Sequence, residues 1–472
     1  MTKLTADILD RLKKIVGPSG YIDDPADMEP YCVSWRDGWR GDTPLVLRPA
    51  STEEVAEIVK LCAASGVPIV PQGGNTGLVG GQVPDMTGSE VVLSLSRLAA
   101  IREIDTASNA IVAEAGVTLH ALREAAEAAG RLFPLSLASQ GTAQIGGNLS
   151  SNAGGTGVLA YGNARELCLG VEVVLPTGEV LDDLRKLKKD NTGYDLKNLF
   201  VGAEGTLGVI TAAVMKLYPK PKGREVAWVG LESPRAALSL FSLASDRAGM
   251  SLTAFELMID ESLAFVLRHV PGAAAPLGSR HPWHVLIEVS SGRSAEDARA
   301  LIEEILGEGF EAGLVADAAL AASLSQAESL WKLRESMSDA QRHEGASIKH
   351  DISVPVASIP DFIDEAWRAV VKIEPAARLV AFGHMGDGNL HYNVSQPAGG
   401  APADFLALYR EVNDAVHDVV RAYRGSISAE HGIGRMKRDE LIATAPPVAT
   451  DLMRRIKAAF DPAGIMNPNK MI

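Results

Sequence analysis

Two histidines in the C-terminal third of the chain are spaced so that a turn can bring their rings together. His384 and His391 lie in Leu379–Val394, which reads as strand, turn and strand, because Asp387-Gly388 is a strong hairpin signal. Their spacing does not fit one helix face, but a tight hairpin brings both imidazoles within reach of one ion. A histidine in a glycine-rich turn is more often structural than a ligand, so this pair alone leaves both interpretations open.

A carboxylate and a further imidazole follow in Ser428–Gly434, where Glu430 and His431 are neighbours. Two histidines and a carboxylate form a typical open Zn²⁺ site, which leaves coordination positions for a substrate. Mn²⁺ or Fe²⁺ would fit the same ligands. Because these candidate groups fall in two compact glycine-bounded motifs, the pattern favours a metal site.

Three glycine-rich stretches predict a second site, for a nucleotide. Pro71–Gly81 follows the strand-like Val67–Pro71, and without Cβ atoms its backbone N–H groups can approach a pyrophosphate closely. It fits neither Gly-x-Gly-x-x-Gly nor Gly-x-x-x-x-Gly-Lys-Ser/Thr, and alone it is equally well a surface loop. Leu135–Gly157 is a second glycine-rich run, and Lys189–Asp195 leads into a third, Val201–Ile210. Together, the three stretches are best explained as walls of one long nucleotide site.

These segments resemble the flavin domain of the vanillyl-alcohol oxidase / p-cresol methylhydroxylase superfamily. Within it, the chain is similar to D-2-hydroxy-acid dehydrogenases, especially those acting on D-2-hydroxyglutarate and D-lactate, from about Thr43 to the C-terminus. The resemblance implies an α+β fold with a two-subdomain FAD-binding domain of the p-cresol methylhydroxylase type. It also implies an α+β substrate, or cap, domain with a large antiparallel sheet, and a C-terminal helical segment.

The elements along the chain suggest where these domains begin and end. We expect a helical lead-in over 1–42, the FAD-binding domain over 43–222, the substrate domain over 223–425, and a C-terminal segment over 426–472 that returns to the FAD-binding domain. A helix from Thr52 to about Ala64 begins with a capping-box-like Ser51-x-x-Glu54. Strands are expected at Glu90–Leu95, Ala110–Ala115, Gly170–Leu175 and His284–Val289, and helices at Ala295–Leu306 and Pro360–Ile373.

The resemblance implies roles for the metal-site residues. His384, His391 and Glu430 correspond to metal ligands, and His431 faces the substrate and the flavin as general base. Oxidising an alcohol carbon by hydride transfer requires loss of the hydroxyl proton, and a divalent cation lowers the pKa of a coordinated oxygen by several units. The cation can also chelate the neighbouring carboxylate, while flavin N5 accepts the hydride.

A cationic clamp is expected for the distal end of the substrate. Trp331–Ser338 looks helical, so Arg334 and Ser338 share one face, and Lys349 lies in a strand-like segment. The resemblance implies that these three groups hold a distal carboxylate, which suits the bidentate geometry of arginine. Ser338 stands where the animal enzymes are expected to have Thr, which keeps the hydroxyl donor but loses a methyl group.

The clamp residues have an alternative role, and one more residue is a candidate for substrate binding. Arg334 and Lys349 could instead pair with surface acids such as Glu335 or Asp351. Asn393, two residues beyond His391, should share its strand face and is a candidate donor to the substrate carboxylate.

FAD is expected to bind non-covalently, because the first glycine run contains neither His nor Cys for covalent attachment. The C-terminal motif around Asn467 is expected near the flavin, although Asn467 could equally be a capping group. The residues expected to contact FAD are Pro71, Gly73, Gly74, Asn75, Thr76, Gly77, Gly80, Gly81, Gln140, Gly141, Thr142, Gly146, Gly147, Asn148, Ser151, Asn152, Gly155, Tyr161, Gly162, Glu204, Gly205, Gly208, Ile210 and Asn467.

The overall composition narrows the class of protein. The chain of 472 residues is 46% hydrophobic and 22% charged, which is ordinary for a globular protein of two or three domains. Its net charge of -14 argues against nucleic-acid binding and means that local cations must meet a substrate carboxylate. Three cysteines without close spacing indicate reduced thiols and a cytoplasmic protein. No transmembrane segment is expected, while peripheral membrane contact stays open.

The leading hypothesis is metal-assisted, FAD-dependent oxidation of a D-2-hydroxy acid of the D-2-hydroxyglutarate, D-lactate or D-malate type. Electrons would pass to an electron-transfer flavoprotein or a quinone, and the family implies a homodimer. One alternative is an oxidase of the same fold that uses O₂ and acts on glycolate or another alcohol. A metal hydrolase whose glycine runs bind a substrate phosphate, and a catalytically silent binding protein, are the alternatives from other classes.

Overall fold

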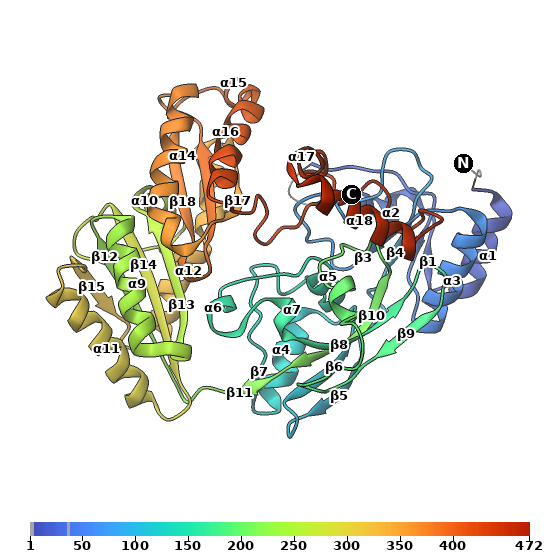
Figure 1. Ribbon diagram of the computed structural model, residues 1–472, viewed down its shortest axis with the longest axis horizontal. Coiled ribbons are helices and arrows are strands. Elements are labelled where there is room, and N and C mark those ends of the chain that lie inside the picture. Colours follow the sequence, from blue (N-terminus) through green and yellow to red (C-terminus); the bar gives the residue numbers. More distant parts are fainter. Residues whose placement is uncertain (1–3, 35–37) are drawn as a thin grey trace. The chain divides into compact units, whose positions relative to one another are not determined.

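A computed structural model describes residues 4–34 and 38–472, so residues 1–3 and 35–37 of the expected lead-in lie outside it. The chain divides into two compact units that are each assembled from separate segments (Figure 1). The N-terminal unit comprises the chain up to Gly154, Gly162–Lys220 and Glu430–Ile472. The central unit comprises Gly155–Tyr161 and Pro221–Ala429.

The first sheet of the N-terminal unit packs against two amphipathic helices, α1 (Ala6–Val16) and α3 (Thr52–Ser65). Helix α3 begins where Ser51 accepts a hydrogen bond from the Glu54 N–H, and it ends at Gly66, whose φ is 66°. The predicted helix and its capped start are therefore confirmed. Over the described residues the sheet has four strands in the order β1 (Tyr21–Ile22), β2 (Val46–Leu47), β4 (Val91–Ser94) and β3 (Ile69–Gln72).

The second sheet of this unit is antiparallel, and it confirms the strands predicted at Ala110–Ala115 and Gly170–Leu175. Counted within residues 38–472, its five strands are β5 (Ile101–Asp105), β6 (Ala110–Glu114), β10 (Val209–Lys216), β8 (Cys168–Val174) and β9 (Val180–Asp183), in that order. The smaller elements of the unit are α2 (Pro25–Cys32), α4 (Leu119–Ala128), β7 (Arg131–Leu132), α5 (Ile145–Ser150), α7 (Ala164–Leu167), α8 (Lys197–Phe200), β11 (Tyr218–Pro219), α17 (Arg438–Thr444) and α18 (Pro447–Phe460).

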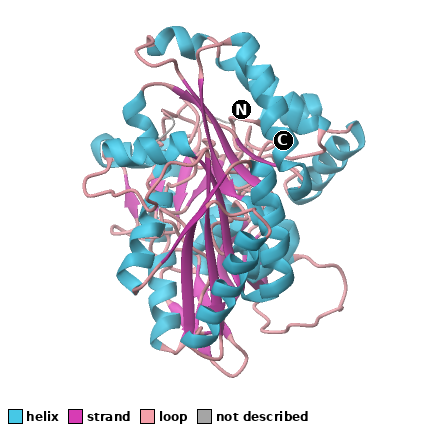
Figure 2. Ribbon diagram, turned by 90° about the vertical axis from the view of Figure 1, so that its left-hand side faces the viewer, coloured by secondary structure: helices cyan, strands magenta, loops and turns pink. Residues whose placement is uncertain are grey.

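The central unit is built on one large antiparallel sheet, as the resemblance implied, with helices on both faces (Figure 2). Its eight strands, counted over the described residues, are β15 (Asp317–Leu320), β12 (Gly223–Leu231), β14 (Trp283–Ser291), β13 (Leu252–Ile259), β18 (Arg378–His384), β19 (Asn389–Ser395) and β16 (Ser347–Ile348), with β17 (Asp351–Ser353) also paired to β19. One face carries α9 (Pro234–Ala248), α11 (Ala295–Glu311), α14 (Ile359–Ile373) and α16 (Tyr409–Ala422). The opposite face carries α10 (Asp260–His269), α12 (Leu324–Glu335) and α13 (Met337–Ala340). Also in this unit are α6 (Val158–Tyr161) and α15 (Pro402–Ala407).

The alternation of side chains along these strands separates the core from the candidate site. In β13, Phe255 and Leu257 pack with α9 and α11, whereas Ala254 and Met258 pack with α10 and α12. Several polar side chains of the sheet have the parity of the second face. These residues are Glu256, Asp351, His384, His391 and Asn393. The sheet thus gathers chemistry-bearing residues on the face that α10, α12 and α13 cover.

Two predicted elements of the central unit differ from the structure. The segment Trp331–Ser338 is helical but not continuous, because α12 ends at Glu335 and α13 begins at Met337. The expected strand around Lys349 is divided between β16 and β17, although both pair with β19 in one register, Ile348 opposite Val394 and Asp351 opposite His391. That register gives Lys349 the same parity as Asp351.

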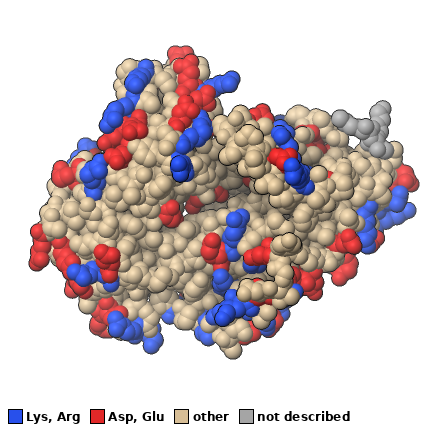
Figure 3. All heavy atoms as spheres, viewed as in Figure 1, with Lys and Arg blue, Asp and Glu red and all other residues tan. Residues whose placement is uncertain are grey.

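The surface and the cysteines agree with a globular protein. Acidic and basic side chains are interspersed over the face seen in Figure 3. Cys32, Cys62 and Cys168, all in the described part of the chain, are free, as predicted, and all three are buried. Burial raises the pKa of both Cys62 and Cys168 to about 12. Among the described residues no helix is both long and apolar enough to cross a membrane.

Candidate active site

A buried carboxylate joins two of the predicted site residues. Glu256 of β13 is 1% exposed, and its Oε2 accepts a hydrogen bond from Arg334 Nε at 2.9 Å and forms an ion pair with Arg334 Nη2 at 2.8 Å. Its other oxygen, Oε1, lies 2.7 Å from Nδ1 of His384. Burial alone would raise the pKa of Glu256, but the charges of His384 and Arg334 outweigh it and lower that pKa to about 2.

This contact fixes the orientation and the tautomer of His384. An ionised carboxylate only accepts hydrogen bonds, so Nδ1 of His384 carries the proton that it shares with Glu256. In the neutral ring the lone pair then lies on Nε2, the form in which histidine binds metals. A carboxylate behind a ligating histidine is a recurrent feature of metal sites.

Four potential ligands come together near the start of β19. Asp351 lies directly opposite His391 in the β17–β19 pair, and the N–H of Ala429 donates to the Asp351 carbonyl at 3.3 Å. Glu430 and His431 follow Ala429 directly in the chain. One ligand atom from each of Asp351, His391, Glu430 and His431 lies within 4.8 Å of the others. The hairpin also brings the rings of His384 and His391 to a centroid distance of 6.1 Å, as its turn signal predicted.

Sequence reasoning treated Asp351 only as a possible ion-pair partner. Its place in the group follows from the strand register with His391. The alternation of buried Ile348 and Ile352 could have placed Asp351 on the polar face of the strand, but it does not specify that register. Asn389 was also missed; its Nδ2 donates to Asp351 Oδ1 at 3.0 Å and so orients this carboxylate. The sequence marks Asp387 only as a turn residue, but in the structure burial raises its pKa to about 6.

The predicted substrate residues lie on the same face of the sheet or on the helices that cover it. Arg334 is 6% exposed and pairs with Glu256 rather than with a surface acid, while its guanidinium lies 4.9 Å from the centroid of the Phe382 ring. Ser338, on α13, is half-buried, and Lys349 is exposed. Buried Asn393 donates from Nδ2 to Gln341 Oε1 at 2.9 Å, so part of its hydrogen-bonding capacity is used within the protein.

In the N-terminal unit, the three glycine-rich stretches lie against one another. A Cβ on Gly74 would lie 1.8 Å from the carbonyl oxygen of Thr142, and one on Gly205 would lie 3.2 Å from Pro71. The third stretch also contacts the second, where the N–H of Glu204 donates to the Ser150 carbonyl at 2.8 Å. The three stretches are therefore neighbours, as expected for walls of one site.

Comparisons with known proteins identify the family. A family model described as "FAD linked oxidases, C-terminal domain" matches residues 220–471, and one described as "FAD binding domain" matches residues 43–183. The D-2-hydroxyglutarate dehydrogenase, mitochondrial, of Bos taurus is 40% identical over 473 residues, covering 99% of this chain and 84% of the relative. The chain belongs to the FAD-linked oxidases and, within them, to the D-2-hydroxy-acid dehydrogenases.

Two further comparisons agree with this assignment. The D-2-hydroxyglutarate dehydrogenase of Xanthomonas citri pv. viticola is 37% identical over 448 residues, covering 95% of this chain and 93% of the relative. A crystal structure of p-cresol methylhydroxylase with substrate bound has a TM-score of 0.77 at 16% identity, covering 99% of this chain and 97% of that one. The latter shows that the dehydrogenase shares the fold of p-cresol methylhydroxylase, as predicted.

The glycine-rich walls of the dehydrogenase fit a nucleotide. Gln144 Oε1 and Asn148 Oδ1 are buried and have no hydrogen-bond partner among the described residues. Buried acceptors left unpaired are costly, so these two oxygens suit donors of a bound ligand. A Cβ on Gly141 or Gly147 would meet nothing within 4 Å, which leaves the backbone of both open to approach.

Several residues expected to contact FAD also form hydrogen bonds that hold the glycine-rich loops in place. Asn467 Nδ2 donates to the carbonyls of Gly81 at 3.0 Å and Glu204 at 2.8 Å, and Asn75 Nδ2 donates to the Pro30 carbonyl at 2.9 Å. Asn152 Oδ1 accepts the Arg165 N–H at 3.0 Å. The other expected contacts in this unit lie along the same loops and the strands that flank them, at Pro71, Gly73, Thr76, Gly77, Gly80, Gln140, Gly146, Ser151, Gly162, Gly208 and Ile210. Gly155 and Tyr161 belong to the short segment that packs in the central unit.

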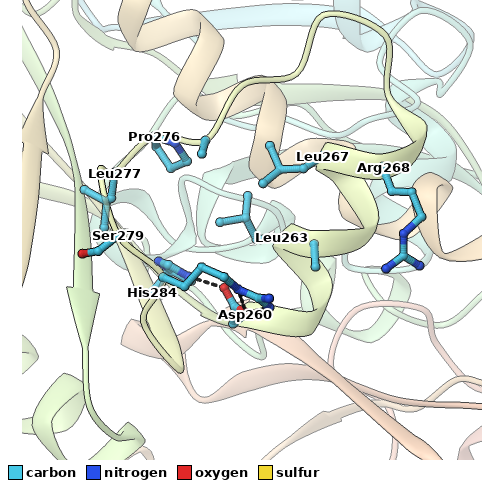
Figure 4. A pocket seen from close by; sticks show the side chains of 11 residues that line it. Asp260, Leu263, Leu267, Arg268, Pro276, Leu277, Ser279 and His284 are labelled. Atoms are coloured by element: carbon cyan, nitrogen blue, oxygen red, sulfur yellow. Dashed lines mark hydrogen bonds and ion pairs between the residues drawn. The ribbon is translucent and has the colours of Figure 1, made fainter.

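The central unit of the dehydrogenase also holds a cavity of about 330 Å³ beside α10 (Figure 4). His284 lies on its wall between Asp260 Oδ1, 3.2 Å from Nε2, and Trp228 Nε1, which donates to Nδ1 at 3.1 Å. Burial lowers the pKa of His284, so the neutral ring donates from Nε2 and accepts at Nδ1. Both nitrogens are used within the fold, and the cavity is lined by none of the predicted site residues.

Proposed function

We propose that this dehydrogenase oxidises a D-2-hydroxy acid to the 2-oxo acid with the help of a divalent metal ion, with Zn²⁺ as the leading choice. His384, His391 and Glu430 would hold the ion, as expected from the sequence. The observation that supports this most directly is the group of imidazoles and carboxylates around His391, next to a histidine whose Nδ1 is held by Glu256. The donor set of nitrogen and carboxylate oxygen suits Zn²⁺ and also Mn²⁺ or Fe²⁺.

The side chains have distinct tasks in this proposal. His431 accepts the proton of the substrate hydroxyl, and Asn393 donates to the carboxylate next to it. Arg334, Ser338 and Lys349 bind the distal end of the substrate. When bound, the metal would make the hydroxyl more acidic, and FAD would accept the hydride at N5.

Other parts of the proposal concern cofactor, partners and location. FAD would bind non-covalently, and an electron-transfer flavoprotein or a quinone would reoxidise it. The substrate would be of the D-2-hydroxyglutarate, D-lactate or D-malate type, the assembly a homodimer, and the location cytoplasmic. The Bos taurus relative is named as mitochondrial and the Xanthomonas relative carries no location in its name, so cell fractionation with an antibody to this chain would test the location.

The central experiment is anaerobic reduction of the purified protein. We expect D-2-hydroxy acids, but not their L-isomers, to bleach the visible absorption band of the bound flavin. A chelator should abolish the bleaching and added Zn²⁺ should restore it. Bleaching that survives complete removal of metal would contradict the role of the ion. Rapid formation of peroxide in air would instead favour an oxidase that uses O₂.

Lys349→Ala is expected to distinguish dicarboxylate from monocarboxylate substrates. Because Lys349 is exposed, its removal should leave the fold intact. Loss of a charge-assisted hydrogen bond should raise KM for D-2-hydroxyglutarate about tenfold or more, with KM for D-lactate essentially unchanged. Steady-state kinetics would measure both values. Lys372→Ala, at an exposed site on α14, is the matched control, and equal effects on the two substrates would contradict the clamp.

Glu256→Gln is expected to weaken metal binding, although Glu256 is not itself a proposed ligand. The amide no longer enforces the Nδ1 proton of His384, and losing such a partner typically lowers metal affinity roughly 10- to 100-fold. Buried Arg334 also loses its counter-charge, which should lower the free energy of unfolding by up to about 3–5 kcal/mol. Metal titration and urea unfolding would measure the two effects.

The matched control for this variant is Glu288→Gln on the same sheet. Glu288 accepts hydrogen bonds from Trp331 Nε1 at 2.8 Å and Arg224 Nε at 2.7 Å, so it is also a partly buried, ion-paired carboxylate. An equal loss of metal affinity in both variants would show that the effect of Glu256 is not specific to His384.

A further inference from the structure

The carboxylate of Glu204 holds the turn that follows Glu430 and His431. Its Oε1 accepts the backbone N–H of Ile433 at 2.7 Å, and its Oε2 accepts the N–H of Gly434 at 2.7 Å. Two consecutive amides therefore donate to the two oxygens of one buried carboxyl group, so losing that group would leave both N–H groups without this acceptor. The two residues expected to bind metal and to act as base stand directly before this turn.

The backbone of Glu204 is itself fixed in an unusual conformation. Its φ is 51°, in the left-handed region that residues with a Cβ seldom adopt. The N–H of Glu204 donates to the Ser150 carbonyl at 2.8 Å, and its carbonyl accepts from Asn467 Nδ2 at 2.8 Å. These contacts tie Glu204 to the second glycine-rich stretch and to the C-terminal motif.

The turn that donates to Glu204 requires glycine at positions 432 and 434. Gly432 has a φ of 82°, and a Cβ there would lie 2.7 Å from Glu204 Oε1. Gly434 has a φ of 51°, and its Cβ would lie 2.3 Å from the carbonyl oxygen of Val79. That same carbonyl accepts the Arg435 N–H at 2.9 Å. The turn is therefore docked on Glu204 and on the first glycine-rich stretch together.

We propose that Glu204 is a positioning residue, which fixes the direction of Glu430 and His431 and links their placement to the glycine-rich loops expected to bind FAD. The inference rests on the proposed function for the roles of these two residues. It also goes beyond the expected contact of Glu204 with FAD, because the carboxylate acts here on the protein backbone. In this arrangement a shift of the glycine-rich loops is transmitted to the metal ligand and the base.

Glu204→Ala and Glu204→Gln test the inference in the full-length protein. Hydrogen–deuterium exchange would follow the amides of residues 430–436, and metal analysis, flavin content and kinetics would follow the site. For Glu204→Ala we expect exchange at Ile433 and Gly434 to rise roughly tenfold or more, because both amides lose their side-chain acceptor. Metal should be held less tightly and kcat should fall more than KM rises. Glu204→Gln keeps one carbonyl acceptor, so its amide exchange, metal affinity and kcat should lie between those of the wild type and Glu204→Ala.

Glu172→Gln is the matched control in the same unit. Glu172 is a buried carboxylate that accepts hydrogen bonds from Thr52 at 2.7 Å and Thr211 at 2.8 Å, away from the 430–436 segment. Unchanged exchange at Ile433 and Gly434 in the Glu204 variants, or a change equal to that in the control, would overturn the inference. If Glu204→Ala does not fold, Glu204→Gln decides by itself through the same amides.

The proposed function and the inference fail in different ways. A wild-type protein that holds no metal and is not reduced by any D-2-hydroxy acid would contradict the proposed function. The exchange of the two amides would still decide whether Glu204 holds the turn. A wild-type protein with metal and activity, together with Glu204 variants that keep the wild-type exchange, metal content and kcat, would overturn the inference alone.

Discussion

His391→Ala is expected to release the bound metal and to lower kcat by more than about 100-fold, while FAD stays bound. Losing a residue behind a ligand already costs about 10- to 100-fold, so loss of the ligand itself should exceed this range. FAD should be retained because the glycine-rich walls lie in the N-terminal unit, whereas His391 belongs to β19 of the central unit. Elemental analysis, the ratio of flavin to protein and anaerobic flavin reduction would measure the three quantities.

The control for this variant is His343→Ala, which removes an exposed histidine of the same unit. It excludes adventitious metal bound by surface imidazoles. A purified His391→Ala protein that keeps its metal and its rate of flavin reduction would contradict the metal site. His384→Ala should behave like His391→Ala, and a difference between them would separate the two predicted ligands.

The parts of the site that sequence reasoning found are carried by local signals. The turn at Asp387-Gly388 predicts the hairpin, and the hairpin determines that His384 and His391 are neighbours. Glycine density likewise marks the loops that must approach one another closely. These features depend on a few consecutive residues, so they can be predicted without knowledge of the fold.

The parts that sequence reasoning missed depend on pairing between distant strands. Glu256 lies 128 residues before His384 and 78 residues before Arg334, inside the largely apolar strand β13. Nothing in its neighbourhood marks it as a partner of either residue. Asp351 reaches the ligand group through its register with His391, which no local pattern specifies.

The cationic clamp shows how a residue type can be recognised while its surroundings are not. The sequence leaves the partner of Arg334 open between a substrate carboxylate and a surface acid, but in the structure Arg334 forms a buried pair with Glu256. The planar guanidinium has five donors, so the pair uses only part of its capacity. In the proposed function, the remaining donors of Arg334 bind the substrate. A change at Arg334 itself would leave Glu256 buried without a counter-charge, so the clamp is tested at the exposed Lys349 instead.

His431→Ala is expected to lower kcat by about 10²- to 10⁴-fold while metal and FAD are both retained, because a general base typically contributes this factor. The dependence of kcat/KM on pH should also lose the rise that reports the essential base. The metal content decides between two roles, since His431 belongs to the group of potential ligands around His391. Retained metal with slow flavin reduction is the result expected for a base. Loss of metal would instead make His431 a ligand and leave proton transfer to another group.

The control for His431→Ala is His120→Ala on α4. His120 is exposed, and its Nε2 lies 3.3 Å from Glu124, so its removal should change neither metal content nor the pH profile. Glu204→Ala provides the complementary comparison, because it keeps the imidazole of His431 but removes the carboxyl group that holds the turn after it. A base that is present but misplaced should keep the pH dependence at a reduced rate, whereas a missing base should remove that dependence. The two variants therefore separate the chemistry of His431 from its placement.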